Sequence, residues 1–408
     1  MRRWGTGGTG DAGDRGGHRG APLREGGGTS AADRHDLQSD HQSSHQGDLK
    51  GDLQGDPRRG RQDPLERWKG TRRRTGLPSA VASLLVVALL VVLSLGTVLA
   101  AGRSWWATVA GPDDGRPLVV AGTTILADLA AQVGGPRVRV HSLLAPGQDP
   151  HSYEPVPRDA LALARARLVL LNGFGIDLWA ERLLQGLPAA GPGRRGPVVV
   201  RVAESLPAGS TLPWPGDPQR TDPHLWMDPV LVMGYVDAIR DALAAVDPAG
   251  AAVYRRRAAD LKAELAALDA WIARQVAQVP PDRRLLVTTH DAYRYFGRRY
   301  GLRVVDTVWG VSTEEEPAAA DLARLMGHLR HYGVPAFVES TINPKLMEEL
   351  AAQAGVAVGG QLYADSVGPP DSGAETYVGM MRHNVRVIVA ALRAGAEGPG
   401  QAAGETGR

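Results

Sequence analysis

From residue 117 onward, short apolar runs alternate with segments whose apolar residues recur at helical spacing. Runs such as 167–171 and 198–200 have the length and composition of buried strands, whereas segments such as 125–130 and 318–331 fit helices. Strands that alternate with helices are typical of parallel sheets flanked by helices. The pattern therefore predicts an α/β fold with parallel-type sheets, with further strands at 117–121, 285–289 and 336–339.

One longer helical pattern, between residues 248 and 278, interrupts this alternation. Its apolar side chains recur at three- and four-residue spacing and form one continuous stripe: Leu261, Leu265, Leu268, Ile272 and Val276. A helix of that length, about 45 Å at the usual rise, is long enough to connect two lobes. We predict two (βα) lobes, 117–247 and 281–395, joined by a connecting helix at 248–280.

The N-terminal part follows a different pattern. Residues 1–76 are polar and end in a cluster of arginines, which predicts a disordered, basic, cytoplasmic tail. Residues 77–102 are uncharged and apolar, long enough for one transmembrane helix that starts on the cytoplasmic side. A cleaved signal peptide is the alternative, because 98–100 resembles a cleavage site. Either interpretation places the chain that follows a linker at 103–116 on the extracellular side of the cell membrane. The polar composition of residues 396–408 predicts a second disordered tail.

The composition of the chain argues against several classes of function. The formal net charge of the 408-residue chain is only +2, so nothing global indicates nucleic-acid binding. Cysteine is absent, which excludes disulfides, thiolate metal sites, cysteine nucleophiles and a lipid-modified cysteine in this sequence. Nitrogen and oxygen ligands would have to bind any metal ion.

Four side chains are candidate metal ligands. His151 and His224 each follow an Asp-Pro step in a proline-rich loop, and this repeat suggests two imidazoles delivered to one place. His290 follows the strand predicted at 285–289, and Asp365 follows an apolar segment before a Gly-Pro-Pro turn. The separations are 73, 66 and 75 residues (224 − 151, 290 − 224, 365 − 290), about two strand–helix units each. Because ligand sites in open α/β sheets lie at the carboxyl ends of strands, we predict a metal cleft between the lobes.

Each candidate also has a structural reading. His151 and His224 would then only cap turns, His290 would open a helix, and Asp365 would be a turn acid. The other histidines of this region fit structural or surface positions in predicted strands and helices: His141, His328, His331 and His383.

With these residues in view, the chain from 117 to 392 resembles the metal-binding solute receptors of ABC importers for zinc, manganese or iron, the TroA/ZnuA-like family. The matching segments are 121–127, 146–157, 170–175, 222–229, 287–292, 310–317, 337–340 and 359–368. The resemblance implies two lobes joined by one rigid helix, with His151, His224, His290 and Asp365 as the ligands. It also implies an ABC-importer permease as partner, a monomeric receptor and no enzymatic activity.

The sequence departs from the family pattern in several places. Family members in single-membrane bacteria are usually anchored by a lipidated cysteine, whose role the apolar segment 77–102 would take here. The stretch 205–220 contains no histidine, whereas zinc receptors of the family often carry a His-rich loop there. The third ligand is His290 rather than the Glu of some manganese receptors. We favour manganese as the bound ion, with zinc next and iron still open.

Two other classes of function are consistent with three imidazoles and a carboxylate. An extracellular zinc-dependent hydrolase would need an open coordination position and a general base, for which Glu154, Glu316 and Glu339 are the candidates. A surface adhesin with a structural metal is the second alternative.

Overall fold

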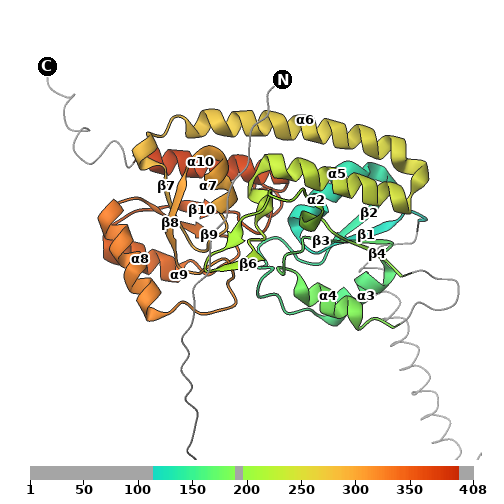
Figure 1. The fold of residues 1–408 in the computed structure, drawn as a ribbon, viewed down its shortest axis with the longest axis horizontal. Helices are drawn as coiled ribbons and strands as arrows, with labels where there is room; N and C mark the ends of the chain where they lie inside the picture. The colour runs from blue at the N-terminus through green and yellow to red at the C-terminus, as the bar shows by residue number, and fades with distance from the viewer. Residues whose placement is uncertain (1–113, 189–195, 395–408) are drawn as a thin grey trace, which may run out of the picture. The chain divides into compact units, whose positions relative to one another are not determined.

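The computed structural model describes residues 114–188 and 196–394, which all belong to one compact unit. Two four-stranded sheets lie side by side, and long helices run along one side of both (Figure 1). All strand pairs within these two sheets are parallel, which confirms the predicted α/β class. The predicted tails, the segment 77–102 and most of the linker at 103–116 lie outside the described residues.

The first sheet has the strand order β2-β1-β3-β4. Its strands are β1 (Leu118–Ala121), β2 (Arg139–Ser142), β3 (Leu168–Leu171) and β4 (Val198–Arg201). Every residue of β1 and β3 is buried, as expected for central parallel strands covered on both faces. Alternate residues face opposite cores, so Val119 packs under one pair of helices and Val120 under the other.

Two helices cover each face of this sheet. They are α2 (Thr124–Gly134) and α5 (Pro229–Val246) on one face, and α3 (Pro157–Arg165) and α4 (Leu178–Gln185) on the other. The hydroxyl of Thr123 accepts a hydrogen bond from the backbone N–H of Leu126, which caps the start of α2. Asp228 caps α5 in the same way and Pro229 follows it, so an acid-proline step begins this helix immediately after the segment of His224.

The second sheet has the order β10-β9-β7-β8. Its strands are β7 (Leu285–Thr288), β8 (Arg303–Thr307), β9 (Ala336–Glu339) and β10 (Val358–Leu362). Its helices are α7 (Arg294–Tyr300) and α10 (Tyr377–Ala394) on the face shared with the long helices, and α8 (Ala319–Tyr332) and α9 (Lys345–Ala354) on the other. Gly333 and Gly355 end α8 and α9 in the left-handed conformation, which glycine adopts without steric cost.

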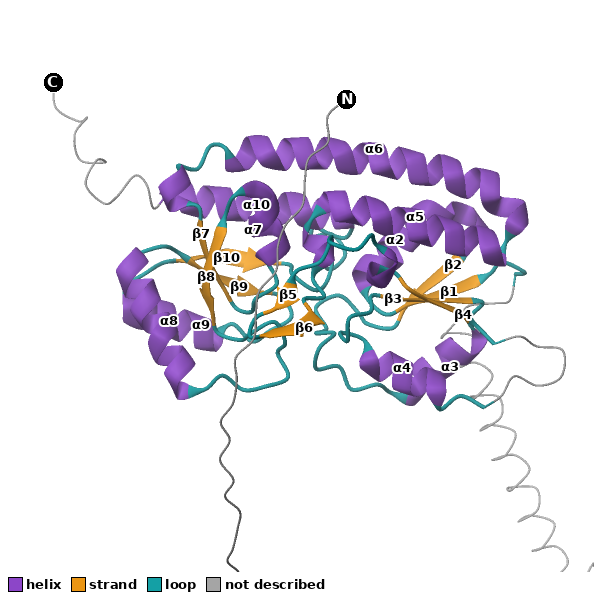
Figure 2. Cartoon of the chain, in the orientation of Figure 1, coloured by secondary structure: helices purple, strands orange, loops and turns teal. Residues whose placement is uncertain are grey.

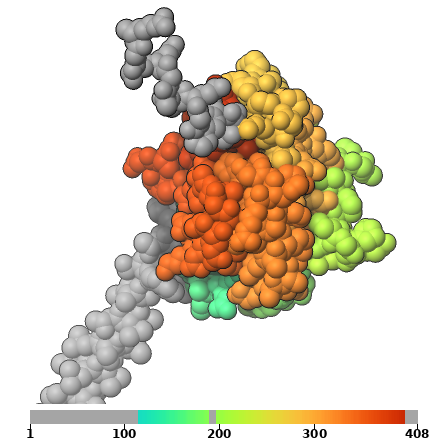
Figure 3. All heavy atoms as spheres, turned by 90° about the vertical axis from the view of Figure 1, so that its left-hand side faces the viewer, coloured from blue at the N-terminus to red at the C-terminus, as the bar shows by residue number. Residues whose placement is uncertain are grey.

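The helix α6 (Ala251–Val276) connects the two halves. Its 26 residues span about 39 Å, and it packs against α2 and α5 of the first half and against α10 of the second. The predicted apolar stripe from Leu261 to Val276 is buried along its whole length. An end-on view of the second half shows α6 (yellow) packed on top of it (Figure 3). The helix is shorter than predicted, because a 3-10 turn at Pro248–Gly250 precedes it.

One element was not predicted, a short antiparallel hairpin formed by β5 (Pro213–Trp214) and β6 (Asp217–Thr221). It lies with other loops between the two sheets, in the centre of Figure 2. Between 114 and 188 and between 196 and 394, no helix has the length and apolar character needed to cross a membrane. The predicted lobe boundaries stay a prediction, since the described residues form one unit.

Candidate metal centre

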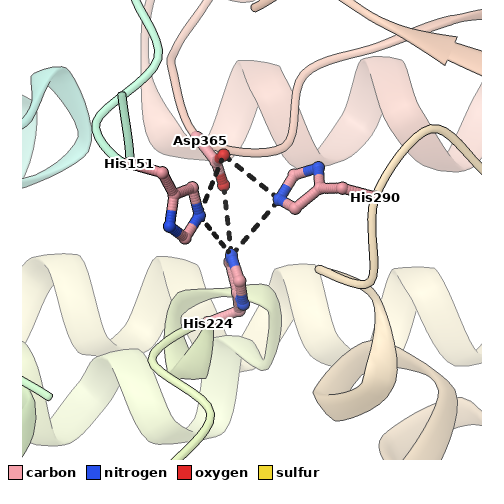
Figure 4. A group of neighbouring side chains, drawn as sticks. All are labelled: His151, His224, His290 and Asp365. Atoms are coloured by element: carbon pink, nitrogen blue, oxygen red, sulfur yellow. Dashed lines mark hydrogen bonds and ion pairs between the residues drawn. The ribbon is translucent and has the colours of Figure 1, made fainter. Parts of the chain in front are cut away.

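The four predicted ligands meet at one point between the two sheets. His151, His224, His290 and Asp365 each present one ligand atom within 4.8 Å of all the others (Figure 4). All four are nearly or completely buried. His151 follows β2, His290 follows β7 and Asp365 follows β10, so these three lie beyond the carboxyl ends of strands, as predicted. His224 instead follows the hairpin strand β6 and precedes α5.

The two Asp-Pro-His segments use the same turn. Asp149 Oδ1 accepts a hydrogen bond from the backbone N–H of His151 at 2.9 Å, and Asp222 Oδ1 accepts one from the backbone N–H of His224 at 3.1 Å. The intervening proline fixes the backbone between acid and histidine. Each Asp-Pro-His segment is therefore a short turn that holds one imidazole in place by local hydrogen bonds.

Ring hydrogen bonds fix two of the imidazoles further. His224 Nδ1 lies 2.8 Å from Asp222 Oδ1, and His290 Nδ1 lies 2.5 Å from Glu339 Oε2. With Nδ1–H donated to a carboxylate, each ring keeps a lone pair on Nε2, which is the tautomer of a metal-binding histidine. The loop of Asp365 is joined to that of His224 by a hydrogen bond of 2.8 Å from Trp226 Nε1 to the carbonyl oxygen of Ala364.

The Nε2 atoms of all three rings point toward the same small volume. His224 Nε2 is 3.2 Å from His151 Nε2 and 3.3 Å from His290 Nε2. Asp365 Oδ2 lies 3.2 Å from His290 Nε2 and 3.7 Å from His151 Nε2, while Oδ1 lies 3.6 Å from His224 Nε2. Three ring nitrogens and two carboxylate oxygens this close together can share one cation, either a proton or a metal ion.

The carboxylate of Asp365 fits a metal ion for a second reason. Both of its oxygens are buried, and neither accepts a hydrogen bond in good geometry from any residue that the structure describes. Burying an ionised carboxylate without hydrogen-bond donors costs free energy, which a bound cation offsets. The donor set, three nitrogens and a carboxylate, is one that zinc and manganese both accept.

The electrostatics of the four groups are strongly coupled. Burial lowers the pKa of His151 to about 3, so this imidazole is neutral at physiological pH. Burial would also lower the pKa of His290, but the facing carboxylates Glu339 and Asp365 raise it well above its usual value. Without metal this ring therefore carries a second proton on Nε2, which a bound cation would replace. For Asp365, burial opposes ionisation, yet His290 and the other two imidazoles hold its pKa far below the usual range. The carboxylate is therefore ionised and ready to bind a cation.

An open hollow of about 920 Å³ leads from the surface to the site. Of the four candidate ligands only His151 lines it, together with Ser152, Trp214 and Arg220. His151 is thus the candidate ligand on the solvent side of the site.

Comparison with known proteins identifies the family. Residues 119–391 match the family model described as zinc-uptake complex component A, periplasmic. The chain belongs to this family. The solved structure of the periplasmic zinc-binding protein TroA from Treponema pallidum has the same fold, with a TM-score of 0.64 and 33% sequence identity over 68% of this chain and 99% of that chain.

Relatives in the family are named for different metals. The manganese-binding lipoprotein MntA of Halalkalibacterium halodurans is 36% identical over 282 residues, which cover 69% of this chain and 90% of the relative. The zinc-binding protein TroA of Treponema pallidum is 35% identical over 285 residues, covering 68% and 90%. The iron-binding protein YfeA of Yersinia pestis is 31% identical over 274 residues, covering 66% and 84%.

In this member of the family, the remaining histidines of the described part lie outside the cluster. His328 Nδ1 lies 2.8 Å from Asp306 Oδ2, and His383 Nε2 lies 3.0 Å from the carbonyl oxygen of Gln361. His141 lies on β2 and His331 is exposed on α8, in agreement with their predicted structural or surface roles.

Sequence reasoning missed the roles of three acids behind the ligands. From the sequence, Asp149 and Asp222 are only parts of the repeat, and Glu339 is either a buried acid at the end of a strand or a candidate base. The repeat itself was the available signal for the two aspartates. Nothing local could have paired Glu339 with His290, because the two are 49 positions apart and meet only through the sheet.

Proposed function

We propose that this protein is an extracytoplasmic receptor that captures one divalent transition-metal ion and delivers it to an ABC permease. The ligands would be His151, His224, His290 and Asp365. One observation carries the proposal, the convergence of three imidazole Nε2 atoms on a buried carboxylate that has no other donor among the described residues. Membership of the family supports the receptor role.

The favoured cargo is manganese, with zinc next. Asp365 presents both of its oxygens toward the imidazoles, so bidentate binding would bring the ligand count to five, above the four that zinc usually takes. Relatives of similar identity are named for manganese, zinc and iron, so similarity by itself does not select among them. Affinity does not select manganese either, because a site of this kind binds zinc more tightly at equal concentration.

We further propose that residues 77–102 anchor a monomeric receptor in the membrane. Several relatives are named lipoproteins, whereas this sequence contains no cysteine to carry a lipid. A protease added to intact cells should digest the domain from 117 to 395 and leave residues 1–76 protected. A mature chain that begins near Ala101 would instead identify the segment as a cleaved signal peptide.

The protein is a receptor and not an enzyme. Of the acids considered as a hydrolytic base, Glu154 and Glu316 are exposed, and Glu339 accepts two hydrogen bonds from His290. No observation favours the hydrolase or the adhesin.

Two single substitutions test the proposed ligands. His151→Ala and His290→Ala should each remove most of the affinity for Zn²⁺ and Mn²⁺ in calorimetric titration, because each deletes one ligand of a four-residue site. His331→Ala, at an exposed position of α8, is the matched control and should titrate like the wild type. Wild-type affinity in both ligand variants would place the site elsewhere.

A further inference from the structure

Two of the ligand imidazoles have a carboxylate behind them, but the two carboxylates are in different electrostatic situations. Asp222 accepts the Nδ1–H of His224 with Oδ1, and its other oxygen lies 3.1 Å from the guanidinium of Arg294. Glu339 uses both oxygens on one residue: Oε2 accepts the Nδ1–H of His290 at 2.5 Å and Oε1 accepts its backbone N–H at 2.9 Å. Asp222 thus has a basic partner in Arg294, whereas the side chain of Glu339 accepts hydrogen bonds from His290 only among the described residues.

Glu339 is also completely buried. Among residues 114–188 and 196–394, no lysine or arginine lies within ion-pair distance of it. A buried carboxylate without a basic residue is costly, because desolvation is then not offset by a permanent opposite charge.

The fold holds Glu339 firmly beside His290. Glu339 is the last residue of β9, and β9 pairs with β7, the strand that ends just before His290. The contact is therefore built on two neighbouring strands of one sheet. Asp222, in contrast, lies in the loop that follows the β5–β6 hairpin.

We propose that Glu339 is the principal positioning residue for the cargo ion. This inference rests on the proposed function. Glu339 acts through His290: it fixes the ring in the orientation that presents Nε2, and its charge, uncancelled by any basic residue that the structure describes, makes that imidazole the stronger donor. Because Arg294 already offsets the charge of Asp222, His224 receives the hydrogen bond without the same electrostatic contribution.

The proposal predicts unequal effects for two matched substitutions. Groups behind a metal ligand typically contribute 10- to 100-fold to metal affinity. Glu339→Gln, which removes the charge and keeps one acceptor oxygen, should weaken Zn²⁺ binding by about that factor. Asp222→Asn should weaken it by less than about 10-fold, since the charge that it removes is already paired with Arg294.

A double variant tests the role of charge without touching Glu339. In an Arg294→Gln background Asp222 loses its cation partner, so adding Asp222→Asn should now cost about 10- to 100-fold, as Glu339→Gln does in the wild type. Arg294→Gln alone should leave Zn²⁺ affinity equal to or above that of the wild type.

The experiment is a set of Zn²⁺ titrations on the full chain and its variants, with Co²⁺ as a spectroscopic probe. We expect the Co²⁺ visible bands to shift in Glu339→Gln and to stay nearly unchanged in Asp222→Asn, because only the first alters the donor strength of a ligand substantially. Equal losses for Glu339→Gln and Asp222→Asn, or no added cost in the Arg294→Gln background, would overturn the inference while the wild type still binds. A wild-type chain that binds no ion would overturn the proposed function as well.

Discussion

The substitution Asp365→Asn should reduce the stabilisation that the protein gains from a bound metal ion. It replaces a buried carboxylate by an amide of nearly the same shape. In the metal-free protein, although burial opposes ionisation, His290 stabilises the charge of Asp365 and holds the pKa of this carboxyl below its usual range, so removing the charge should lower the melting temperature to some extent. In the metal-loaded protein the same change would delete the only anionic member of the four proposed ligands.

The size of the effect follows from linkage. Groups behind a ligand contribute up to about 100-fold to affinity, so loss of a direct anionic ligand should cost at least that, or about 2.7 kcal/mol. At a free-ion concentration about 1,000 times the wild-type Kd, binding stabilises the wild type by about 4.1 kcal/mol, and a 100-fold weaker variant by about 1.4 kcal/mol. At about 2–4 °C per kcal/mol, the metal-induced rise in melting temperature should fall by about 5–10 °C.

Scanning calorimetry with chelator and with excess Zn²⁺ measures both effects in one series. The reasoning is refuted if Asp365→Asn shows the full wild-type rise with Zn²⁺. It is also refuted if the metal-free variant melts well above the metal-free wild type, since the charge of Asp365 would then be destabilising in the metal-free protein.

Three further predictions concern release, pH and motion. Thr313, which follows β8, donates a hydrogen bond of 2.5 Å to Asp149 in the loop of His151. Thr313→Val should therefore speed ion dissociation about 10-fold in stopped-flow chelator experiments. Thr341→Val is the control and should leave the rate unchanged, because the hydroxyl of Thr341 has no hydrogen-bond partner among the described residues. Burial raises the pKa of Asp177 from 3.8 to about 7, so the contribution of this carboxyl to the free energy of unfolding is full below pH 3.8 and is lost as the pH rises through 7. Over this range the free energy of unfolding of the metal-free wild type, measured with urea, should fall by up to about 4 kcal/mol. An unchanged pH slope in Asp177→Asn would contradict this prediction. Because bending α6 would expose its buried stripe, scattering should give nearly equal radii of gyration with and without metal, and a clear expansion on metal removal would argue against a rigid connection.

Much of the fold was predictable because its signals are local. The strands β1 and β3 are wholly apolar, and α6 carries its stripe at regular helical spacing, so burial followed directly from the pattern. The hairpin β5–β6 was missed because its strand Asp217–Thr221 is polar throughout and pairs with a strand of only two residues. No alternation of apolar and polar positions marks such a strand.

The candidate ligands were predictable for a similar reason. The Asp-Pro-His repeat marks His151 and His224 locally. His290 and Asp365 each follow an apolar segment at a similar separation, and the resemblance to the family falls on the same four residues. The partners behind the ligands depend on tertiary contacts instead. Arg294 reaches Asp222 across 72 positions, a contact that no periodicity or motif could indicate.

The central claim, that this protein carries a metal ion, is tested most directly by elemental analysis of the chain purified from cells grown with balanced metals. The account predicts one divalent transition-metal ion per chain, and almost none in a variant in which His151, His224 and His290 are all replaced by alanine. Metal content that stays below about one ion per ten chains in the wild type, or that is the same in the triple variant, would contradict it.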